Sequence, residues 1–273
     1  MQKFILSEIN IYPIKSLGGI ILKTAMVEKR GLRLDRRWML VDDENKFISQ
    51  REYPQMALIK VEAGVNGLKV SHKKYFGESI FIPFNNHTVE EIEVKIWNDV
   101  CLAQLLNKNY GSWFSKILGI KCNLVFMPDG SIRKVDTKYS NGNEIVSFAD
   151  AYPFLLIGQS SLDELNSKLS APVPMNRFRP NLVFTGGNAF VEDKWKKFKI
   201  GDVEFECVKP CARCTITTVN QDTAEMKKEP LATLSKFRKF GNKVLFGQNL
   251  IHKGEGVIKI GDELTILEEK IDI

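Results

Sequence analysis

Apolar and polar residues alternate along much of the first half of the chain, which is the pattern of half-buried β-strands. Residues 4–12 (FILSEINIY) predict a strand with Ile5 and Ile9 facing the core. The same pattern predicts a hairpin at 36–52 with an Asp-Asp-Glu-Asn turn and a second hairpin at 58–72 around Val65-Asn66-Gly67. It also predicts one further strand at 91–98. Short strands in a meander of this kind close into a barrel or a sandwich.

Helical periodicity is confined to a few segments. Apolar residues at i, i+3, i+4, i+7 and i+8 predict a helix that Gly119 ends: Tyr110, Trp113, Phe114, Ile117 and Leu118. A capping box of Ser161 and Glu164 predicts a helix at 160–169. Pro230 at the first turn and Gly241 at the end predict another helix at 230–240. The polar residues 127–144 predict a surface connection between two β-rich halves. The fold class expected is therefore α+β, β-rich.

Composition excludes several classes of protein. The 273 residues are 44% hydrophobic and 26% charged, which is ordinary for a soluble globular chain. The net charge of +6 comes from dispersed lysines, so no nucleic-acid surface and no nucleic-acid partner are expected. Residues 1–16 hold no apolar core for a signal peptide or a membrane span. No membrane partner is therefore expected. An odd number of cysteines, five, in a chain without a secretory signal predicts reduced thiols in the cytoplasm.

Three cysteines fall within eight residues, in the stretch CVKPCARC (207–214). Alternation over 203–208 predicts a strand with Cys207 in the core, which Lys209-Pro210 ends. The stretch 211–214 is then a turn, and 215–219 starts the next strand. Cys214 is expected at the mouth of that strand, with Arg213 favouring its thiolate, the form that binds metals.

Other cysteine chemistries fit the sequence less well. The C-x3-C-x2-C spacing matches the iron–sulfur motif of radical S-adenosylmethionine enzymes, but in those it comes early in a long β/α barrel. Structural zinc normally has four ligands, and Cys101, Cys122 and the three histidines are isolated. A thioredoxin-type C-x-x-C opens a helix and not a strand. Iron–sulfur, zinc and dithiol sites remain as minor alternatives.

Five stretches carry a family resemblance: YPIKS (12–16), LDRRW (34–38), FRPN (178–181), the long segment CARCTITTVNQDTAEMKKEPLATL (211–234) and LFGQN (245–249). The chain resembles two-part MOSC proteins, the group of the amidoxime-reducing components, over nearly its whole length. The resemblance implies a MOSC N-terminal β-barrel-like domain over 1–125. A MOSC β-barrel domain with a few peripheral helices then covers 126–273. The family's usual Asp after TTV is Asn220 here, which should affect only the turn.

The resemblance also implies a cofactor and the residues that bind it. Family members bind a molybdenum cofactor (Mo-molybdopterin), whose metal takes a sulfur ligand that maps onto Cys214, so Cys214 is both metal ligand and catalytic residue. The other cofactor-binding positions map onto Lys15, Ser16, Arg36, Arg179 and Asn181. Asp150 maps onto a family aspartate and is a candidate catalytic residue and proton donor. Gln248 and Asn249 are candidate site residues, and Arg51 matches a family arginine without an assigned role.

Structural roles compete with these assignments. Lys15 could be a surface lysine, Arg36 could pair with Asp35, and Arg179 and Asn181 could only fix a loop. Asp150 could serve as a structural cap or ion-pair partner.

By resemblance, the expected activity is reduction of N-hydroxylated compounds such as amidoximes, hydroxylamines and N-hydroxylated bases. Electrons are expected from a separate donor protein of flavoprotein, ferredoxin or cytochrome b5 type. The alternative is a carrier that holds the cofactor, or persulfide sulfur on Cys214, and reduces nothing.

Overall fold

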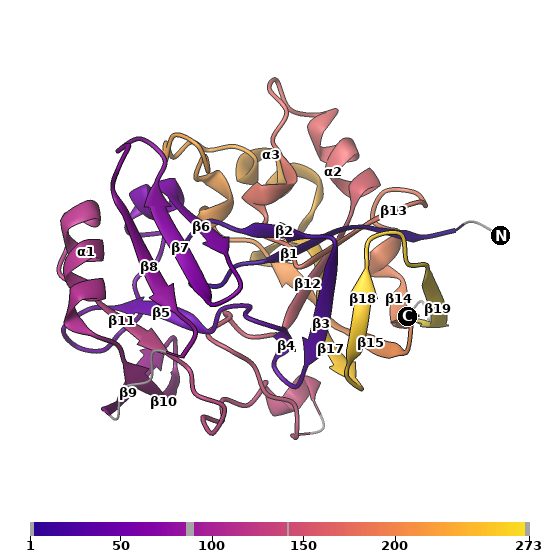
Figure 1. Cartoon of the computed structure of the whole chain (residues 1–273). Helices are drawn as coiled ribbons and strands as arrows, with labels where there is room; N and C mark the ends of the chain where they lie inside the picture. The colour runs from indigo at the N-terminus through magenta and orange to yellow at the C-terminus, as the bar shows by residue number, and fades with distance from the viewer. Residues whose placement is uncertain (1–2, 86–89, 141, 271–273) are drawn as a thin grey trace.

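The computed structural model describes residues 3–85, 90–140 and 142–270, and it is rich in β-structure (Figure 1). Its largest sheet runs in the order β19-β14-β15-β17-β12-β13-β1-β2, with β16 paired to β17. The strands of this sheet are β19 (Leu264–Glu269), β14 (Trp195–Ile200), β15 (Val203–Ala212), β17 (Lys243–Lys253), β12 (Phe154–Gly158), β13 (Leu182–Thr185), β1 (Ile5–Ile11), β2 (Ile20–Leu22) and β16 (Lys239–Phe240).

Three smaller sheets complete the β-structure of the described residues. The first is β5 (Trp38–Val41), β11 (Asn123–Phe126), β10 (Asp99–Leu105) and β9 (Glu91–Ile96). The second is β18 (Gly256–Lys259), β3 (Thr24–Glu28) and β4 (Gly31–Leu32). The third is β6 (Ile59–Ala63), β7 (Gly67–His72) and β8 (Ser79–Pro83). The helices are α1 (Lys108–Leu118), α2 (Gln159–Asn166) and α3 (Leu231–Phe237), with short 3-10 turns η1 (Pro54–Leu58), η2 (Thr137–Tyr139), η3 (Met175–Arg177), η4 (Val191–Asp193) and η5 (Thr215–Thr218).

The two halves of the chain form two lobes that share strands (Figure 1). Helix α1 and β5 to β11 make one lobe around the buried Trp38, Met56 and Phe114. The large sheet makes the other around Phe154, Trp195 and Phe205. Yet β1 pairs with β13 and β3 pairs with β18, so the beginning of the chain is built into the second lobe. The division into domains at residues 125 and 126 stays a prediction.

Several predicted elements are confirmed. The strand at 4–12, the 58–72 hairpin and the strand at 91–98 form as β1, β6–β7 and β9. Helix α1 ends at Gly119, whose φ of 68° is the left-handed cap that the sequence predicts. A register shift between Leu6 and Glu8 changes the alternation in β1, so Leu6 and Ile9 are buried while Ile5 is only partly so.

Other local predictions were wrong for identifiable reasons. The 36–52 hairpin forms its first strand, β5, and its turn, but its second strand does not form. The returning segment makes one bridge, Val41 to Phe47, and Phe47 N also bonds to the carbonyl of Lys95 in β9. Helix α3 stops at Phe237, because the chain turns into β16, and Gly241 then forms the β16–β17 turn. The segment 127–144 is not purely superficial, because Met127, Arg133 and Val135 are buried.

The capping box at Ser161 and Glu164 does not form. Helix α2 begins after Gly158, without a side-chain cap, because β12 leads straight into it. Instead the carboxylate of Glu192, which is fully buried, accepts hydrogen bonds from Gly158 N at 3.1 Å and Ser161 Oγ at 2.8 Å. Burial raises the pKa of Glu192. Glu192, which is distant in sequence, therefore accepts the hydrogen bonds of donors at the start of α2.

The predicted end of the strand at Lys209-Pro210 was also wrong. Strand β15 continues to Ala212, because register shifts on either side of Lys209 and Pro210 leave room for a residue without an N–H. Residues 215–219 do not start a strand. They form η5, in which the hydroxyls of Thr217 and Thr218 donate to the carbonyls of Cys214 and Thr215 at 3.0 and 2.7 Å. Cys214 therefore precedes a 3-10 turn and does not open a strand.

We expect Glu192→Ala to lower the free energy of unfolding by about 2 kcal/mol, because it leaves buried N–H and O–H donors without a partner. Urea denaturation measures the change. Glu164→Ala on the same helix is the control, because its exposed pair with Lys168 is worth at most about 0.5 kcal/mol. Equal losses in both variants would contradict the capping role.

Candidate active site

One cavity brings together the residues that the sequence singled out. Lys15, Ser16, Arg36, Asp150, Arg179 and Asn181 all line it, although they come from four distant parts of the chain. Arg51, Cys211, Arg213 and Asn249 line it too. Gln248 does not, because its amide is fully buried and bonds to Asp193 and Lys270 at 2.6 and 3.3 Å. Of the two candidates in the LFGQN motif, Gln248 and Asn249, only Asn249 lines the cavity.

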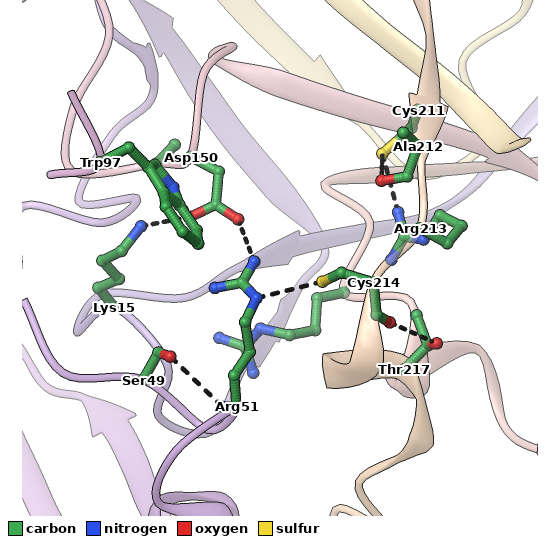
Figure 2. A network of polar contacts seen from close by, with 12 residues as sticks. Lys15, Ser49, Arg51, Trp97, Asp150, Cys211, Ala212, Arg213, Cys214 and Thr217 are labelled. Atoms are coloured by element: carbon green, nitrogen blue, oxygen red, sulfur yellow. Dashed lines mark hydrogen bonds and ion pairs between the residues drawn. The ribbon is translucent and has the colours of Figure 1, made fainter. Parts of the chain in front are cut away.

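The Cys214 thiol lies beside this cavity with an arginine partner (Figure 2). Its Sγ accepts a hydrogen bond from Arg51 Nε at 3.2 Å. Arg213, the partner expected from the sequence, instead donates to Cys211 Sγ at 3.0 Å and to the Phe178 carbonyl at 2.7 Å. The cation in contact with the Cys214 sulfur is therefore Arg51, which is distant in sequence.

The three clustered cysteines have three different environments. Cys207 is confirmed as a core residue of β15, 4% exposed, and burial raises its pKa to about 12. Cys211 is held by Arg213 and Cys214 by Arg51. Within the described ranges, no group of three or more Cys, His, Asp or Glu side chains is placed to hold a metal ion. The three sulfurs of the C-x3-C-x2-C motif therefore lie in three separate environments.

Asp150 connects two cations next to Cys214. Its Oδ1 accepts from Lys15 Nζ at 2.6 Å, and its Oδ2 accepts from Arg51 Nη2 at 2.8 Å (Figure 2). Although burial opposes this, the charges of Lys15 and Arg51 hold the pKa of Asp150 well below its usual range. Asp150 is therefore an ionised acceptor at neutral pH.

Lys15 is buried, 5% exposed, and is no surface lysine. Its ammonium also donates to the Phe148 carbonyl at 2.7 Å and lies 5.0 Å from the centre of the Phe47 ring. Burial lowers the pKa of Lys15 to about 8, and Asp150 limits the fall. Lys15 thus carries an exchangeable proton close to neutral pH.

Arg133, which the sequence did not single out, fixes the backbone around Asp150. Its guanidinium donates to the carbonyls of Ser147, Ala149 and Asp150 at 2.9, 2.6 and 2.8 Å, and it pairs with Asp99 at 2.7 Å. Nothing in the local pattern of 127–144 marks this arginine, because its partners are carbonyls of another segment.

Arg36 and Asn181 are engaged in bonds within the protein. Arg36 Nη1 donates to Asp35 Oδ2 at 2.6 Å and to Asn181 Oδ1 at 3.1 Å. Asn181 Oδ1 also accepts from Leu155 N at 3.3 Å, and its Nδ2 donates to the Asn10 carbonyl at 3.1 Å. These contacts join β1 to the start of β12, and Arg36, Leu155 and Asn181 all line the cavity.

Arg179 differs from the other arginines of the cavity. It is 8% exposed, and its guanidinium makes no hydrogen bond or ion pair with any residue in the described part of the chain. It lies over the Tyr12 ring, 4.1 Å from the ring centroid, and Arg36 makes a similar contact with the same ring at 4.3 Å. Burial lowers the pKa of Arg179 to about 10. A buried cation without an anion fits a cavity that receives an anionic ligand.

Comparison with known proteins identifies the family. The MOSC N-terminal beta barrel domain matches residues 3–121, and the MOSC domain matches residues 143–265. Mitochondrial amidoxime-reducing component 1 of Mus musculus is 30% identical over 276 residues, which cover 94% of this chain and 80% of that protein.

The chain belongs to the MOSC family. The human amidoxime-reducing component 1 is also 30% identical, over 94% of this MOSC protein and 81% of its own length. The molybdenum cofactor sulfurase of Oryza sativa subsp. japonica is 30% identical over 89% of this chain and 32% of its own. Relatives of this MOSC protein thus include both amidoxime-reducing components and cofactor sulfurases. None of its described helices is long and apolar enough to span a membrane.

We expect one lysine of this MOSC protein to titrate near pH 8 in a ¹³C-lysine NMR titration, and its resonance to be missing in Lys15→Met. In Asp150→Asn the same midpoint should fall, because the carboxylate that favours the ammonium is gone. Between about pH 8 and 10.5 the unfolded chain still binds the proton that the folded chain has lost, so Lys15 makes stability rise with pH in that window. Lysines that all titrate above pH 10 would contradict the assignment.

Proposed function

We propose that this MOSC protein is a molybdenum-cofactor-dependent reductase of N-hydroxylated compounds. The observation that carries the proposal is the pairing of an arginine-held thiol, Cys214, with a cation-rich cavity whose buried Arg179 has no partner in the described chain. The names of the amidoxime-reducing relatives support the same activity. Electrons would come from a separate donor protein, of flavoprotein, ferredoxin or cytochrome b5 type, in the cytoplasm.

The cavity residues fit the cofactor that this activity needs. Cys214 would supply the protein sulfur to the metal, while Arg179, Lys15 and Arg36 would face the anionic groups of the ligand. Ser16 and Asn181 would add neutral hydrogen-bonding groups. When bound, the cofactor supplies an oxygen-accepting metal and a store of electrons.

The protein's own contribution to the reaction is proton supply and orientation. Reduction of an N–OH group consumes two electrons and two protons and releases water. Asp150 is ionised and is therefore a poor proton donor. Its role in the proposed reaction is to accept a hydrogen bond from the substrate. Lys15, whose pKa is about 8, holds a proton at Nζ within 2.6 Å of Asp150 and is better suited to release it near neutral pH.

A second candidate function is delivery of cofactor or sulfur without reduction. It is favoured by the likeness to a molybdenum cofactor sulfurase and by the partly exposed Cys214 thiol, which a persulfide donor could reach. A carrier would hold persulfide sulfur on Cys214 and would not turn over an amidoxime.

We expect nearly one molybdenum and one pterin per chain in protein from a host that makes the cofactor, and reduction of benzamidoxime with a reduced viologen as donor. Cys214→Ser should lose the metal and the activity, because it lacks the thiolate ligand. Cys101→Ala, which removes a buried thiol outside the cavity, should keep both. Metal analysis, pterin fluorescence and viologen oxidation are the measurements. Persulfide on Cys214 without molybdenum would favour the carrier, and iron or zinc would refute both functions.

We further expect Arg179→Met to separate binding from stability. In cofactor-free protein, removal of an unpaired buried cation should raise the free energy of unfolding by about 1 kcal/mol. In protein from the cofactor-producing host, the same variant should carry less pterin. Arg213→Met is the matched control, because this arginine is already bonded to Cys211 and Phe178 and its loss should lower stability. Lower stability of cofactor-free Arg179→Met would show that Arg179 is structural.

A further inference from the structure

Trp97, at the tip of the β9–β10 hairpin, is a strained residue beside the site. Its φ is 56°, a backbone conformation that is rare for a bulky side chain and therefore unfavourable. Despite its size it is 53% exposed. Strain of this kind persists where surrounding contacts hold the residue, and it is common at ligand sites.

Three contacts of Trp97 with described residues connect it to the site. Its ring lies over the Arg51 guanidinium, 4.7 Å from centroid to Cζ, and meets the Phe47 ring edge-on at 4.9 Å. Its Nε1 donates to Asp150 Oδ1 at 3.4 Å, and Figure 2 shows the indole next to this carboxylate. Because Arg51 also bonds to Cys214, a ligand on Trp97 and Asp150 would be one guanidinium away from the sulfur.

Asp150 has acceptor capacity left for a ligand. A carboxylate offers about four lone-pair positions. The carboxylate of Asp150 accepts hydrogen bonds from three donors, Lys15, Arg51 and Trp97. The Asp150 side chain is 52% exposed, so a further N–H donor can reach it. The neighbouring cations Lys15 and Arg51 disfavour a positively charged ligand at the same place.

We propose that Trp97 and Asp150 form a recognition wall for flat, neutral substrates that carry an N–H donor. The exposed part of the indole stacks on the planar ligand, and the Asp150 carboxylate accepts from its amino group. An aryl amidoxime has both features, whereas an aliphatic hydroxylamine lacks the planar surface. The substrate's identity rests on the proposed reductase function, but the wall itself is a binding site that can be measured without turnover.

The test is to measure the binding of benzamidoxime to the oxidised protein by calorimetry, without an electron donor. We expect Trp97→Ala to weaken binding about fivefold or more, in line with the usual strength of aromatic stacking, and Trp97→Phe to restore most of it. Val100→Ala is the matched control, because Val100 is equally exposed, 53%, on the same hairpin but has neither an aromatic ring nor a side-chain N–H. Its affinity should equal that of the wild type.

Turnover with a reduced viologen supplies the second readout. In Trp97→Ala the KM for benzamidoxime should rise by about the same factor while kcat and molybdenum content stay near wild type, and the KM for an aliphatic N-alkylhydroxylamine should not change. Unchanged binding and KM in Trp97→Ala would overturn the wall. So would a fall in kcat and metal content alone, because this would mean that Trp97 only positions Arg51. If wild type binds benzamidoxime through Trp97 but reduces no N-hydroxylated compound, the reductase function fails and the wall stands.

Discussion

The carboxylate of Asp150 is the contact on which the site depends. It joins Lys15, which follows β1, to Arg51, which follows β5, and it meets Trp97 from the β9–β10 hairpin. Asp150 itself belongs to the segment before β12, so a single carboxylate connects the first half of the chain to the second. Arg133 fixes the Asp150 backbone by donating to its carbonyl. A half-exposed anion can do this because two cations compensate it at short range.

The site has an excess of positive charge and of strained backbone, and both point to a ligand. Eight non-glycine residues in the described part of the chain have positive φ, and four of them are Ser16, Arg36, Trp97 and Arg179. Such residues each lower stability, as does an unpaired cation like Arg179. Two extensive apolar cores, one in each lobe, offset these costs. An anionic cofactor would remove the charge imbalance that the protein alone leaves at Arg179.

The sequence predicted the parts that local chemistry determines. Alternation located β1, β6, β7 and β9, and the Gly119 cap ended α1 because a left-handed terminus favours glycine. It failed where a distant residue changes the local preference, as when Glu192 replaces the capping box and when Phe47 bonds to β9. For the site, the motifs YPIKS, LDRRW and FRPN identified cavity residues, but Arg133 and Trp97 have partners that only the fold brings near. The mutual pairing of Arg36 and Asn181 was likewise invisible, because 145 residues separate them.

The cysteine cluster shows how topology divides one motif among separate roles. Alternation along β15 buries Cys207, and this burial raises the pKa of its thiol, so Cys207 is a core residue. The register shifts around Pro210 carry the strand on to Ala212, which leaves Cys211 at the cavity with Arg213. Only after the strand ends does Cys214 reach Arg51, a residue of the first lobe. The fold therefore distinguishes the two partly exposed sulfurs by the arginine that it brings to each of them. Spacing alone allowed a cluster, whereas the meeting of the two lobes at Arg51 and Asp150 places the Cys214 sulfur by itself beside a cationic cavity.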